Sequence, residues 1–503
     1  MSINFIVNDP LALGSVPMRQ KQPLPERPTG QAGFTFVDAS PAGLFDPGNP
    51  DFLFWQSREA ALTAIQTWES LNGPLTQWGS EAQNPDRLNL LPDAGDDLNA
   101  FYDRSSLSFF HHAIDSQTFF SGASTDVVSH ESGHAFLDTL RPELFGTNIT
   151  EHGAFHEAFG DCTALLTALS DQGTRQALLA ASPDLGAPNF VESLSEQLSS
   201  AVKLAFGPQH PAAEPRHALN DFKFQLPTTL PRTGPPAVLT SEIHSFGRIF
   251  VGCFYDMIRN IFQNASSKDE AALLSVVQTA GRLLIAGAKQ AEISPRFFQS
   301  VGRAIVLADQ TMNEGKNQQP ISDAFARHGI LLGTMAALMP KASLAGPAPS
   351  VSAKAKSLLA PETLRDIRKR IEAPAGAKFS FRSLALGGER VVHAVHYREV
   401  QLDRYGKDLK GVVAYAPEPV VVGGVQKVAA VFNILPDPST TEDEVGAFVE
   451  TLLSNQRISF EAKENAGKGF LGTSGPSGPR NYTTHVLKVR RGKKVLIRIR
   501  YSC

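Results

Sequence analysis

The chain has 503 residues, of which 42% are hydrophobic and 19% charged, an ordinary globular composition with enough length for more than one domain. Its 47 basic and 50 acidic residues are interspersed and give a formal net charge of −3, which argues against nucleic-acid or membrane binding through a global field. The three cysteines are far apart and odd in number, which argues against a disulfide framework or a CxxC metal site.

The first residues lack a basic region followed by a continuous apolar core, so we expect no Sec signal. No later segment supplies the roughly 18 uncharged apolar residues that a membrane span needs. We therefore expect a soluble, cytoplasmic protein without a membrane partner, and export by a non-Sec route is the open alternative.

The N-terminal half begins irregularly. Residues 1–50 are rich in Pro, Gly and Asp and predict irregular structure. A helix is then predicted from Ser57, as its cap, to the Asn72-Gly73 stop, and strand and turn follow over 99–126.

Helices dominate the middle of the chain, and a linker separates them from the tail. Apolar faces predict helices over 126–140, 152–170, 187–205, 242–263, 267–289 and 294–312. Residues 340–356 have the Pro, Ala, Ser, Gly and Lys composition of a linker. Short β-branched runs beyond it, with one helix over 441–454, predict a small α+β unit.

An HExxH motif spans His130 to His134 on the first of these helices. Residues four apart on a helix share one face, so both imidazoles can reach one metal ion, while Glu131 lies about 100° round the helix. Apolar neighbours favour a buried helix. The pattern is typical of a catalytic zinc site with Glu131 as general base, although HExxH also occurs by chance.

A third ligand separates these two interpretations, because catalytic zinc generally takes three protein ligands. Glu157 lies on the next helix, after a break at Arg141-Pro142, and Asp161 follows it by one turn. We expect Glu157 to bind the metal and Asp161 to accept the second ring N–H of a histidine ligand. The alternative, a solvated acidic stripe, is disfavoured by the apolar residues around them.

Several segments in order resemble the thermolysin-like gluzincin peptidases. The resemblance covers about residues 50 to 335. It rests on LNAFYDRSS (98–106), DVVSHESGH (126–134), HGAFHEAFGD (152–161), EIHSFGRIF (242–250) and ISDAFARHGI (321–330).

The resemblance implies further site residues. Asn99 and the Ala100 backbone would bind an extended substrate peptide by strand addition. His244 would stabilise the oxyanion, and Arg216 would bind a substrate carbonyl beyond the scissile bond. Relatives place the residue after that bond in an apolar pocket, to which Val127 could contribute.

Other positions depart from the family pattern. Phe145 stands where relatives have an active-site tyrosine, and His156 where they have asparagine. The acidic partner of the second histidine is replaced by Leu239, which leaves Glu242 or Asp221 as candidate orienters of His244.

The resemblance also bears on metals. One zinc per chain is expected. Calcium is not expected to be required, because Asp126 matches a family calcium ligand but its partner position is Ala168; Asp126 was instead a candidate cap of the zinc helix.

The predicted fold class is therefore α+β. A thermolysin-like module, with a mixed N-terminal lobe and a mainly helical C-terminal lobe, precedes a small α+β domain of unknown role. The predicted divisions are an N-terminal segment (1–50), the module (51–335, lobes about 51–140 and 141–335), a linker (336–360) and the tail domain (361–503).

The predicted function is a zinc-dependent endopeptidase that hydrolyses a polypeptide substrate by a metal-activated water, with Glu131 as general base. The alternative is a catalytically weak or inactive zinc-binding scaffold whose C-terminal domain binds a partner. Phe145 and Leu239 favour that alternative, and the intact Glu131 argues against it, since a structural zinc site needs no base. A peptidase delivered to other cells as an effector is a third possibility. The basic run 490–494 predicts a solvated face, or else a site for an acidic partner.

Overall fold

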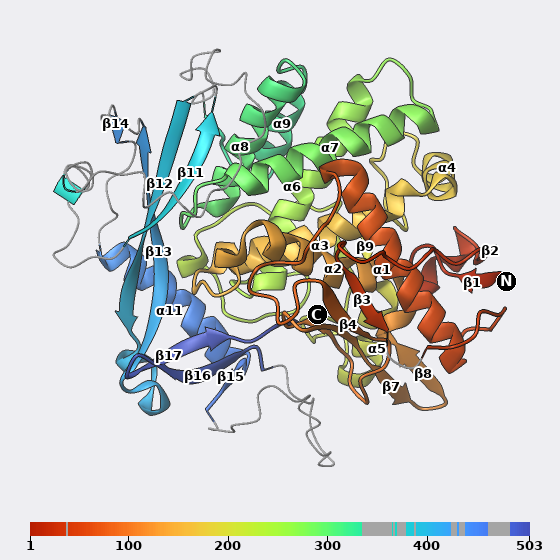
Figure 1. The fold of residues 1–503 in the computed structure, drawn as a ribbon, viewed down its shortest axis with the longest axis horizontal. Coiled ribbons are helices and arrows are strands. Elements are labelled where there is room, and N and C mark those ends of the chain that lie inside the picture. The colour runs from red at the N-terminus through yellow and green to blue at the C-terminus, as the bar shows by residue number, and fades with distance from the viewer. Residues whose placement is uncertain are drawn as a thin grey trace.

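The computed structural model combines helices with several sheets, which confirms the predicted α+β class (Figure 1). It describes residues 1–36, 39–333, 365, 368–369, 379–386, 389–423, 430–431, 438–460 and 483–502. The predicted linker, 336–360, lies outside the described residues.

The sheet of the N-terminal lobe draws strands from both ends of the chain. Its order is β18-β5-β6-β4-β3. The strands are β3 (Gly33–Phe36), β4 (Arg87–Leu91), β5 (Ala100–Tyr102), β6 (Ser106–Phe109) and β18 (Tyr501–Ser502). β3, β4 and β6 run parallel, whereas β5 is antiparallel to β6 and β18 is antiparallel to β5.

The first 50 residues are more regular than predicted. β1 (Ile3–Phe5) pairs with β2 (Arg19–Lys21), and β3 joins the main sheet. The sequence signal was weak because these strands are only three or four residues long and lie between proline-rich turns. A separate hairpin, β7 (His111–Ile114) with β8 (Gln117–Phe120), leads into the zinc helix.

The helix α1 (Pro50–Asn72) begins seven residues before the predicted cap at Ser57. Asn49 is the N-cap, its side chain accepts a hydrogen bond from the Asp51 N–H, and Pro50 occupies the first turn. Proline is favoured there because its missing N–H would have no helical partner. The predicted stop is confirmed, since Gly73 ends the helix with φ +78°.

Eight more α-helices follow over residues 125–327. They are α2 (Thr125–Leu140), α3 (Thr150–Ser170), α4 (Gln172–Ala181), α5 (Glu196–Phe206), α6 (Ile243–Asn264), α7 (Glu270–Gln290), α8 (Phe297–Met312) and α9 (Gln318–Arg327). The helix predicted over 187–205 is wrong in its first half. There, Asn189 accepts backbone hydrogen bonds from Val191 and Glu192 in a turn, and β9 (Ser193–Leu194) pairs with β10 (Arg216–His217).

Glycines bring α2, α3 and α6 unusually close together. A Cβ on Gly133 of α2 would lie 2.8 Å from the Cα of Gly160 on α3. A Cβ on Gly247 of α6 would lie 2.9 Å from the Ala154 carbonyl oxygen of α3. Only glycine permits such approaches, so α3 lies tightly between the other two helices. These three helices carry the candidate metal ligands and His244.

The C-terminal part contains a sheet and one helix. The sheet order is β11-β12-β13-β17-β16-β15, with β14 beside β13. The strands are β11 (Phe379–Leu386), β12 (Glu389–Gln401), β13 (Val412–Gly423), β14 (Ala430–Val431), β15 (Ile458–Ser459), β16 (His485–Arg490) and β17 (Lys493–Arg498). The helix α11 (Pro438–Ser454) corresponds to the one predicted over 441–454.

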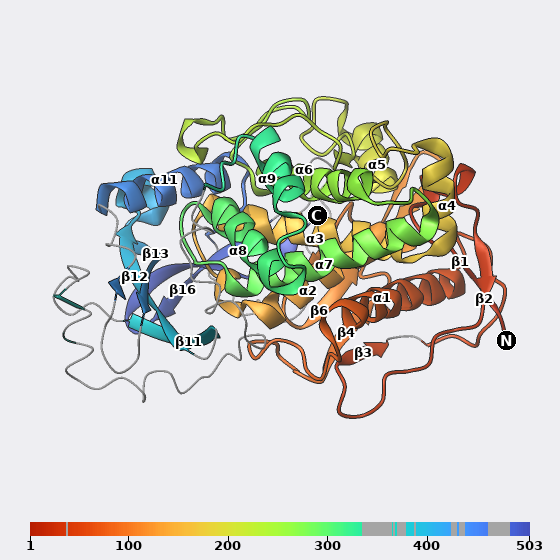
Figure 2. The same ribbon diagram turned by 90° about the horizontal axis from the view of Figure 1, so that it is seen from above.

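This C-terminal part contacts the helical lobe through polar pairs. Glu450 of α11 accepts from Arg232 at 2.7 Å, and Thr451 lies 2.6 Å from Ser241, oxygen to oxygen. The Asn148 amide donates to the Tyr415 carbonyl at 3.1 Å. The chain then returns from β17 to the N-terminal lobe, so its end lies in the middle of the molecule (Figures 1 and 2). The predicted domain boundaries stay predictions.

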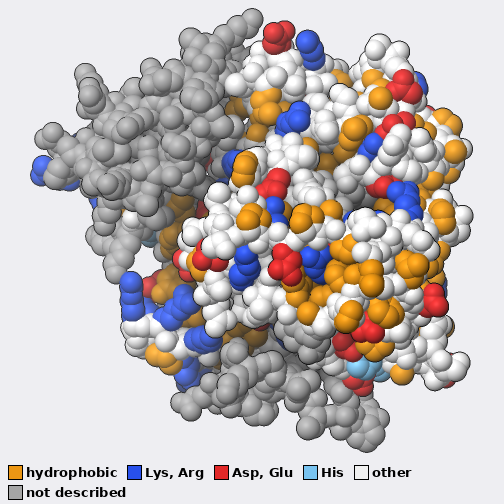
Figure 3. All heavy atoms as spheres, turned by 45° about the vertical axis from the view of Figure 1, so that its right-hand side comes forward, with side chains coloured by type: hydrophobic (Ala, Val, Ile, Leu, Met, Phe, Trp, Pro, Cys, Tyr) orange, Lys and Arg blue, Asp and Glu red, His pale blue; other side chains and the backbone are white. Residues whose placement is uncertain are grey.

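One helix among the described residues, α7, has the length and composition of a membrane span. More than half of that stretch is buried in the protein, where α7 packs against α6 and α8. A buried core helix satisfies the same criteria, so α7 is described here as a core helix. On the face shown in Figure 3, basic side chains gather at the lower left, and acidic and basic side chains are interspersed over the rest of the coloured atoms.

Candidate metal centre

The zinc helix α2 is fixed at its start by Ser124. This residue is the N-cap, its side chain accepts from the Val127 N–H at 3.4 Å, and its hydroxyl donates to Asp9 at 2.7 Å. The expectation that Asp126 caps the helix is therefore wrong. Asp126 lies in the first turn, where its carboxylate accepts from the Asn8 amide at 2.9 Å.

His130, His134 and Glu157 form a cluster with the donor set of a catalytic zinc site. Their ligand atoms all lie within 4.8 Å of one another, and it is the one such cluster in the part of the chain that the structure describes. Oε2 of Glu157 lies 3.3 Å from Nε2 of His130 and 3.6 Å from Nε2 of His134. The three side chains are almost completely buried, and Nε2 of His134 has no hydrogen-bond partner. Two imidazole nitrogens and one carboxylate fit zinc and leave a coordination position open.

The second ring nitrogen of each histidine has a defined neighbour. Nδ1 of His130 lies 2.8 Å from Asp161 Oδ1, the contact that the sequence predicted for Asp161. Nδ1 of His134 lies 3.0 Å from Nδ1 of His156. His156 was noted in the sequence only as a departure from the family pattern. Its position one residue before Glu157 on α3 explains why it reaches the other histidine.

Charges around the cluster hold the ligands in the forms that bind metal. Burial alone would raise the pKa of Glu157, but the adjacent His244 and His134 outweigh it and hold that pKa well below its usual range. Arg216 and His130 likewise lower the pKa of Asp161 to about 2 against the effect of burial. Burial lowers the pKa of His134 to about 3. The carboxylates are therefore anionic and His134 neutral at physiological pH.

Glu131 is fully buried on α2 and does not belong to the three-ligand cluster. It follows His130 directly, so it lies beside the metal face rather than on it, as the HExxH spacing predicts. Glu131 is therefore next to a cluster residue along α2 without being one of the three candidate ligands.

His244 lies in the first turn of α6 and faces the cluster. Its Nε2 is 3.1 Å from Oε2 of Glu157, and its Nδ1 is 2.8 Å from Oε1 of Glu242. Glu242 is also the N-cap of α6, so the residue that starts the helix orients the histidine. Burial lowers the pKa of His244, but Glu157 and Glu242 outweigh it and raise that pKa to about 10. His244 is then a cationic hydrogen-bond donor.

Of the two orienters that the sequence left open, the structure places Glu242 beside His244. The side chain of Asp221 is 86% exposed and pairs with Arg327 instead. Leu239, at the position of the family's acidic partner, is a buried apolar residue.

The Arg216 side chain is held by residues of the site. From β10, its guanidinium donates to Asp161 Oδ1 at 2.8 Å and lies 3.4 Å from Nδ1 of His130. It therefore stabilises the carboxylate that orients His130. Its predicted contact with a substrate carbonyl stays a prediction.

Asn99 and Ala100 lie at the start of β5, the strand predicted to bind substrate. Oδ1 of Asn99 accepts from the Ala100 N–H at 2.9 Å and from the Ser502 hydroxyl at 2.9 Å. The edge of β5 that faces away from β6 is paired with β18. The predicted substrate position is thus next to the chain's own C-terminal strand, which no sequence pattern indicated.

Phe145 is buried beside the cluster, where its ring contacts a guanidinium and several aromatic rings. The Arg104 guanidinium lies 4.1 Å from its centroid, and the Tyr501 ring packs edge-on at 5.3 Å. Tyr501 also stacks on His156 and His134, at 3.9 Å and 4.8 Å between centroids. An aromatic residue from the C-terminal strand therefore lies next to the position at which relatives have a tyrosine.

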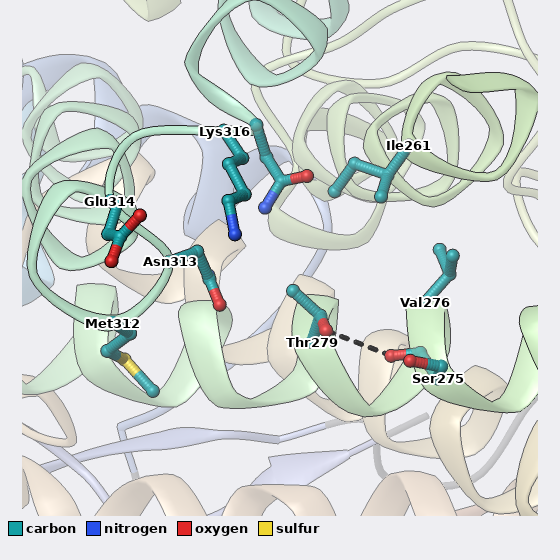
Figure 4. A pocket seen from close by; sticks show the side chains of 9 residues that line it. Ile261, Ser275, Val276, Thr279, Met312, Asn313, Glu314 and Lys316 are labelled. Atoms are coloured by element: carbon teal, nitrogen blue, oxygen red, sulfur yellow. Dashed lines mark hydrogen bonds between the residues drawn. The ribbon is translucent and has the colours of Figure 1, made fainter. Parts of the chain in front are cut away.

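Two pockets lie in the part of the chain that the structure describes. A small one at the start of α2 is lined by Val127, the residue that the resemblance implicates in an apolar pocket, together with Asp97, Leu98, Phe110, Phe119, Phe120, Ser121, Ser124, Gln197 and Leu198. A larger pocket of about 290 Å³ lies between α7, the end of α6 and the turn after α8 (Figure 4). It contains none of the candidate site residues.

Comparison with protein families finds a match over part of the chain. Residues 227–336 match the family of the fungalysin metallopeptidases (M36), a thermolysin-like gluzincin family. The matched region includes His244 and α6 to α9 and lies downstream of the HExxH motif. No curated protein matches the chain. Together, the family match and the His130–His134–Glu157 cluster support a zinc metalloprotease of the hydrolase class.

Proposed function

We propose that the chain is a zinc-dependent endopeptidase with one zinc site made by His130, His134 and Glu157. The observation that carries this proposal is the buried three-ligand cluster with Glu131 next to it on the same helix. A purely structural site would close its fourth position and would not need a buried carboxylate beside it. The fungalysin match supports the same reaction class.

When bound, zinc supplies a Lewis acid that polarises a carbonyl oxygen and acidifies water. Glu131 takes the proton of the attacking water and transfers it to the leaving amine, so the amide is cleaved to a carboxylate and an amine. His244, cationic because of Glu157 and Glu242, donates to the oxyanion that develops on the scissile carbonyl. Asp161 and His156 hold the rings of the two ligand histidines.

A polypeptide substrate would bind in extended form along β5, since the edge of β5 that pairs with β18 offers main-chain donors and acceptors for a peptide. Asn99 would contact it through its side-chain amide. The family resemblance, which implicates Val127 in an apolar pocket, supports a preference for an apolar residue after the scissile bond. We propose no role for calcium.

The test compares wild type with Glu131→Gln and His134→Ala. Glu131→Gln should retain one zinc per chain and lose hydrolysis of a denatured protein, because it removes the base but no ligand. His134→Ala should lose zinc. Mass spectrometry of the cleaved substrate should show new internal termini, mainly before bulky apolar residues.

Several outcomes would contradict the proposal. If Glu131→Gln lost zinc as completely as His134→Ala, the assigned roles would be wrong. If wild type held zinc but left the denatured substrate intact, the inactive-scaffold alternative would be favoured. Release of terminal residues alone would exclude an endopeptidase.

A further inference from the structure

The chain's own C-terminal strand lies on the edge of β5. Tyr501 pairs with Tyr102 and Ser502 with Phe101 in antiparallel register. The Ser502 hydroxyl donates to Asn99 Oδ1 at 2.9 Å. β18 is the outer strand of the sheet, so β5 would present an open edge without it. An extended peptide is thus already bound where the proposed function places the substrate.

The side chain of Tyr501 extends this contact to the metal cluster. It is buried, and its ring is stacked on His156 at an interplanar angle of 17° and on the metal-ligand candidate His134 at 25°. Aromatic contacts of this kind stabilise a ring beyond the burial of its area alone. The ring therefore fixes the strand beside the cluster, and it occupies space that a substrate side chain would need.

Arg498, at the end of β17, contacts the Tyr501 ring and helps to hold it in place. Its guanidinium lies 4.2 Å from the centroid of the Tyr501 ring, and a Cβ on Gly153 would lie 3.2 Å from its Nη2. Its three side-chain nitrogens are buried and have no hydrogen-bond partner among the described residues. A buried cation of this kind depends on the aromatic face, so Arg498 and Tyr501 hold each other in place.

A strand edge can pair with only one partner at a time, because each main-chain donor and acceptor on it is used once. We propose that Tyr501 and Ser502 act as a built-in competitor of the polypeptide substrate, and that they must leave β5 before a substrate can bind there. This inference rests on the proposed function, which assigns β5 to substrate binding. The ladder is only two residues long, so the strand is displaceable rather than a permanent part of the sheet.

Binding of a labelled peptide tests this competition without requiring hydrolysis. The probe is a fluorescent peptide with the sequence of residues 495–502, VLIRIRYS. All proteins carry Glu131→Gln so that the probe stays intact. Tyr501→Ala should bind the probe at least tenfold more tightly than the parent protein, because the edge of β5 is freed. Val489→Ala, at an exposed position of the same C-terminal hairpin, is the matched control and should bind like the parent.

A second substitution tests the proposal in case Tyr501→Ala does not fold. A second peptide tests whether the probe binds through its tyrosine. Tyr501→Leu keeps apolar volume but cannot stack, so it should also open the site. A probe with alanine in place of the tyrosine should bind the opened variants about tenfold more weakly than the original probe. Equal probe affinity in the parent, Tyr501→Ala and Tyr501→Leu proteins would overturn the proposal.

Activity then separates this inference from the proposed function. With Glu131 intact, Tyr501→Leu should lower KM for a short peptide substrate about tenfold, with a smaller change in kcat. If no protein hydrolysed peptide but the probe still bound only to opened variants, the peptidase assignment would fail and the competition would stand. If all proteins hydrolysed peptide with the same KM, the competition would fail alone.

Discussion

Gly160 packs directly against the ring of His130. A Cβ at position 160 would lie 2.7 Å from Nδ1 of His130, the atom that meets Asp161 at 2.8 Å. The glycine therefore leaves the space in which the imidazole adopts the orientation needed to face Glu157. A methyl group there would move the ring or separate α2 from α3.

Gly160→Ala should accordingly weaken zinc binding by about 10–100-fold, the usual cost of disturbing the outer partner of a ligand histidine. The measurement is zinc competition with a chromogenic chelator. Gly146→Ala is the matched control, since a Cβ there would meet nothing within 4 Å. Wild-type zinc affinity in Gly160→Ala would show that the ring tolerates the contact.

Local spacing in the sequence was sufficient to predict the residues of the candidate metal cluster. His130 and His134 follow from a four-residue period on one helix, and the neighbouring carboxylates of α3 follow from the same period. A contact of Asp161 with a ligand histidine was expected, without a choice between the two, and Asp161 lies 2.8 Å from Nδ1 of His130. Such features depend only on short-range helix geometry, which sequence reveals well.

The long-range parts of the site could not be predicted in this way. Tyr501 meets His134 and His156 only because the chain returns from β17 to the first sheet, and no local pattern encodes that return. The choice of Glu242 over Asp221 likewise depended on how α6 is capped. The early start of α1 follows from the Asn49-Pro50 cap, which lies before the stretch whose apolar period predicts the helix.

His244→Ala should reduce turnover by about 10²–10³-fold, the usual cost of removing one oxyanion donor, with zinc content unchanged. The expectation follows from its cationic state and its position beside Glu157. His217→Ala, which removes an exposed histidine on β10, is the matched control and should leave turnover intact. If His244→Ala turned over substrate like wild type, His244 would have a structural role only.

Glu242→Gln should shift the alkaline limb of the turnover profile to lower pH. Glu242 is one of the two carboxylates that raise the pKa of His244, so its neutral replacement lowers that pKa, and the donor form is lost earlier as pH rises. Glutamine keeps a side-chain oxygen that can cap α6. The measurement is kcat against pH for both proteins, and an unmoved alkaline limb would show that His244 is not the titrating group.

Millimolar calcium should change thermal stability little. Asp126 is buried and accepts from Asn8, and Ala168, at the family's partner position, offers no carboxylate. Calcium prefers six to eight oxygen ligands with several charges among them. The measurement is thermal unfolding at constant zinc, with calcium or with a calcium-selective chelator. A midpoint raised by many degrees in calcium would contradict the expectation.

Asp9 should make the protein less stable as pH rises from about 4 to about 6. Its carboxylate accepts from the Ser124 hydroxyl, which ties the N-terminal segment to the start of the zinc helix. Burial, assisted by the charge of Glu196, raises the pKa of Asp9 from 3.8 to about 6. Between these values the folded state holds a proton that the unfolded state has lost, so the free energy of unfolding falls with pH by up to about 1.4 kcal/mol per unit.

Asp9→Asn removes this titration. The free energy of unfolding of Asp9→Asn minus that of wild type should therefore increase as pH rises from 4 to 6 and then stay constant. Urea unfolding at pH 4.5, 6 and 7.5 with zinc held constant measures the difference, and the pH dependence of zinc binding cancels between the two proteins. Asp323→Asn, at an exposed position of α9, is the control, and its difference from wild type should not vary with pH. A flat difference for Asp9→Asn as well would mean that Asp9 is ionised in the folded protein throughout this range.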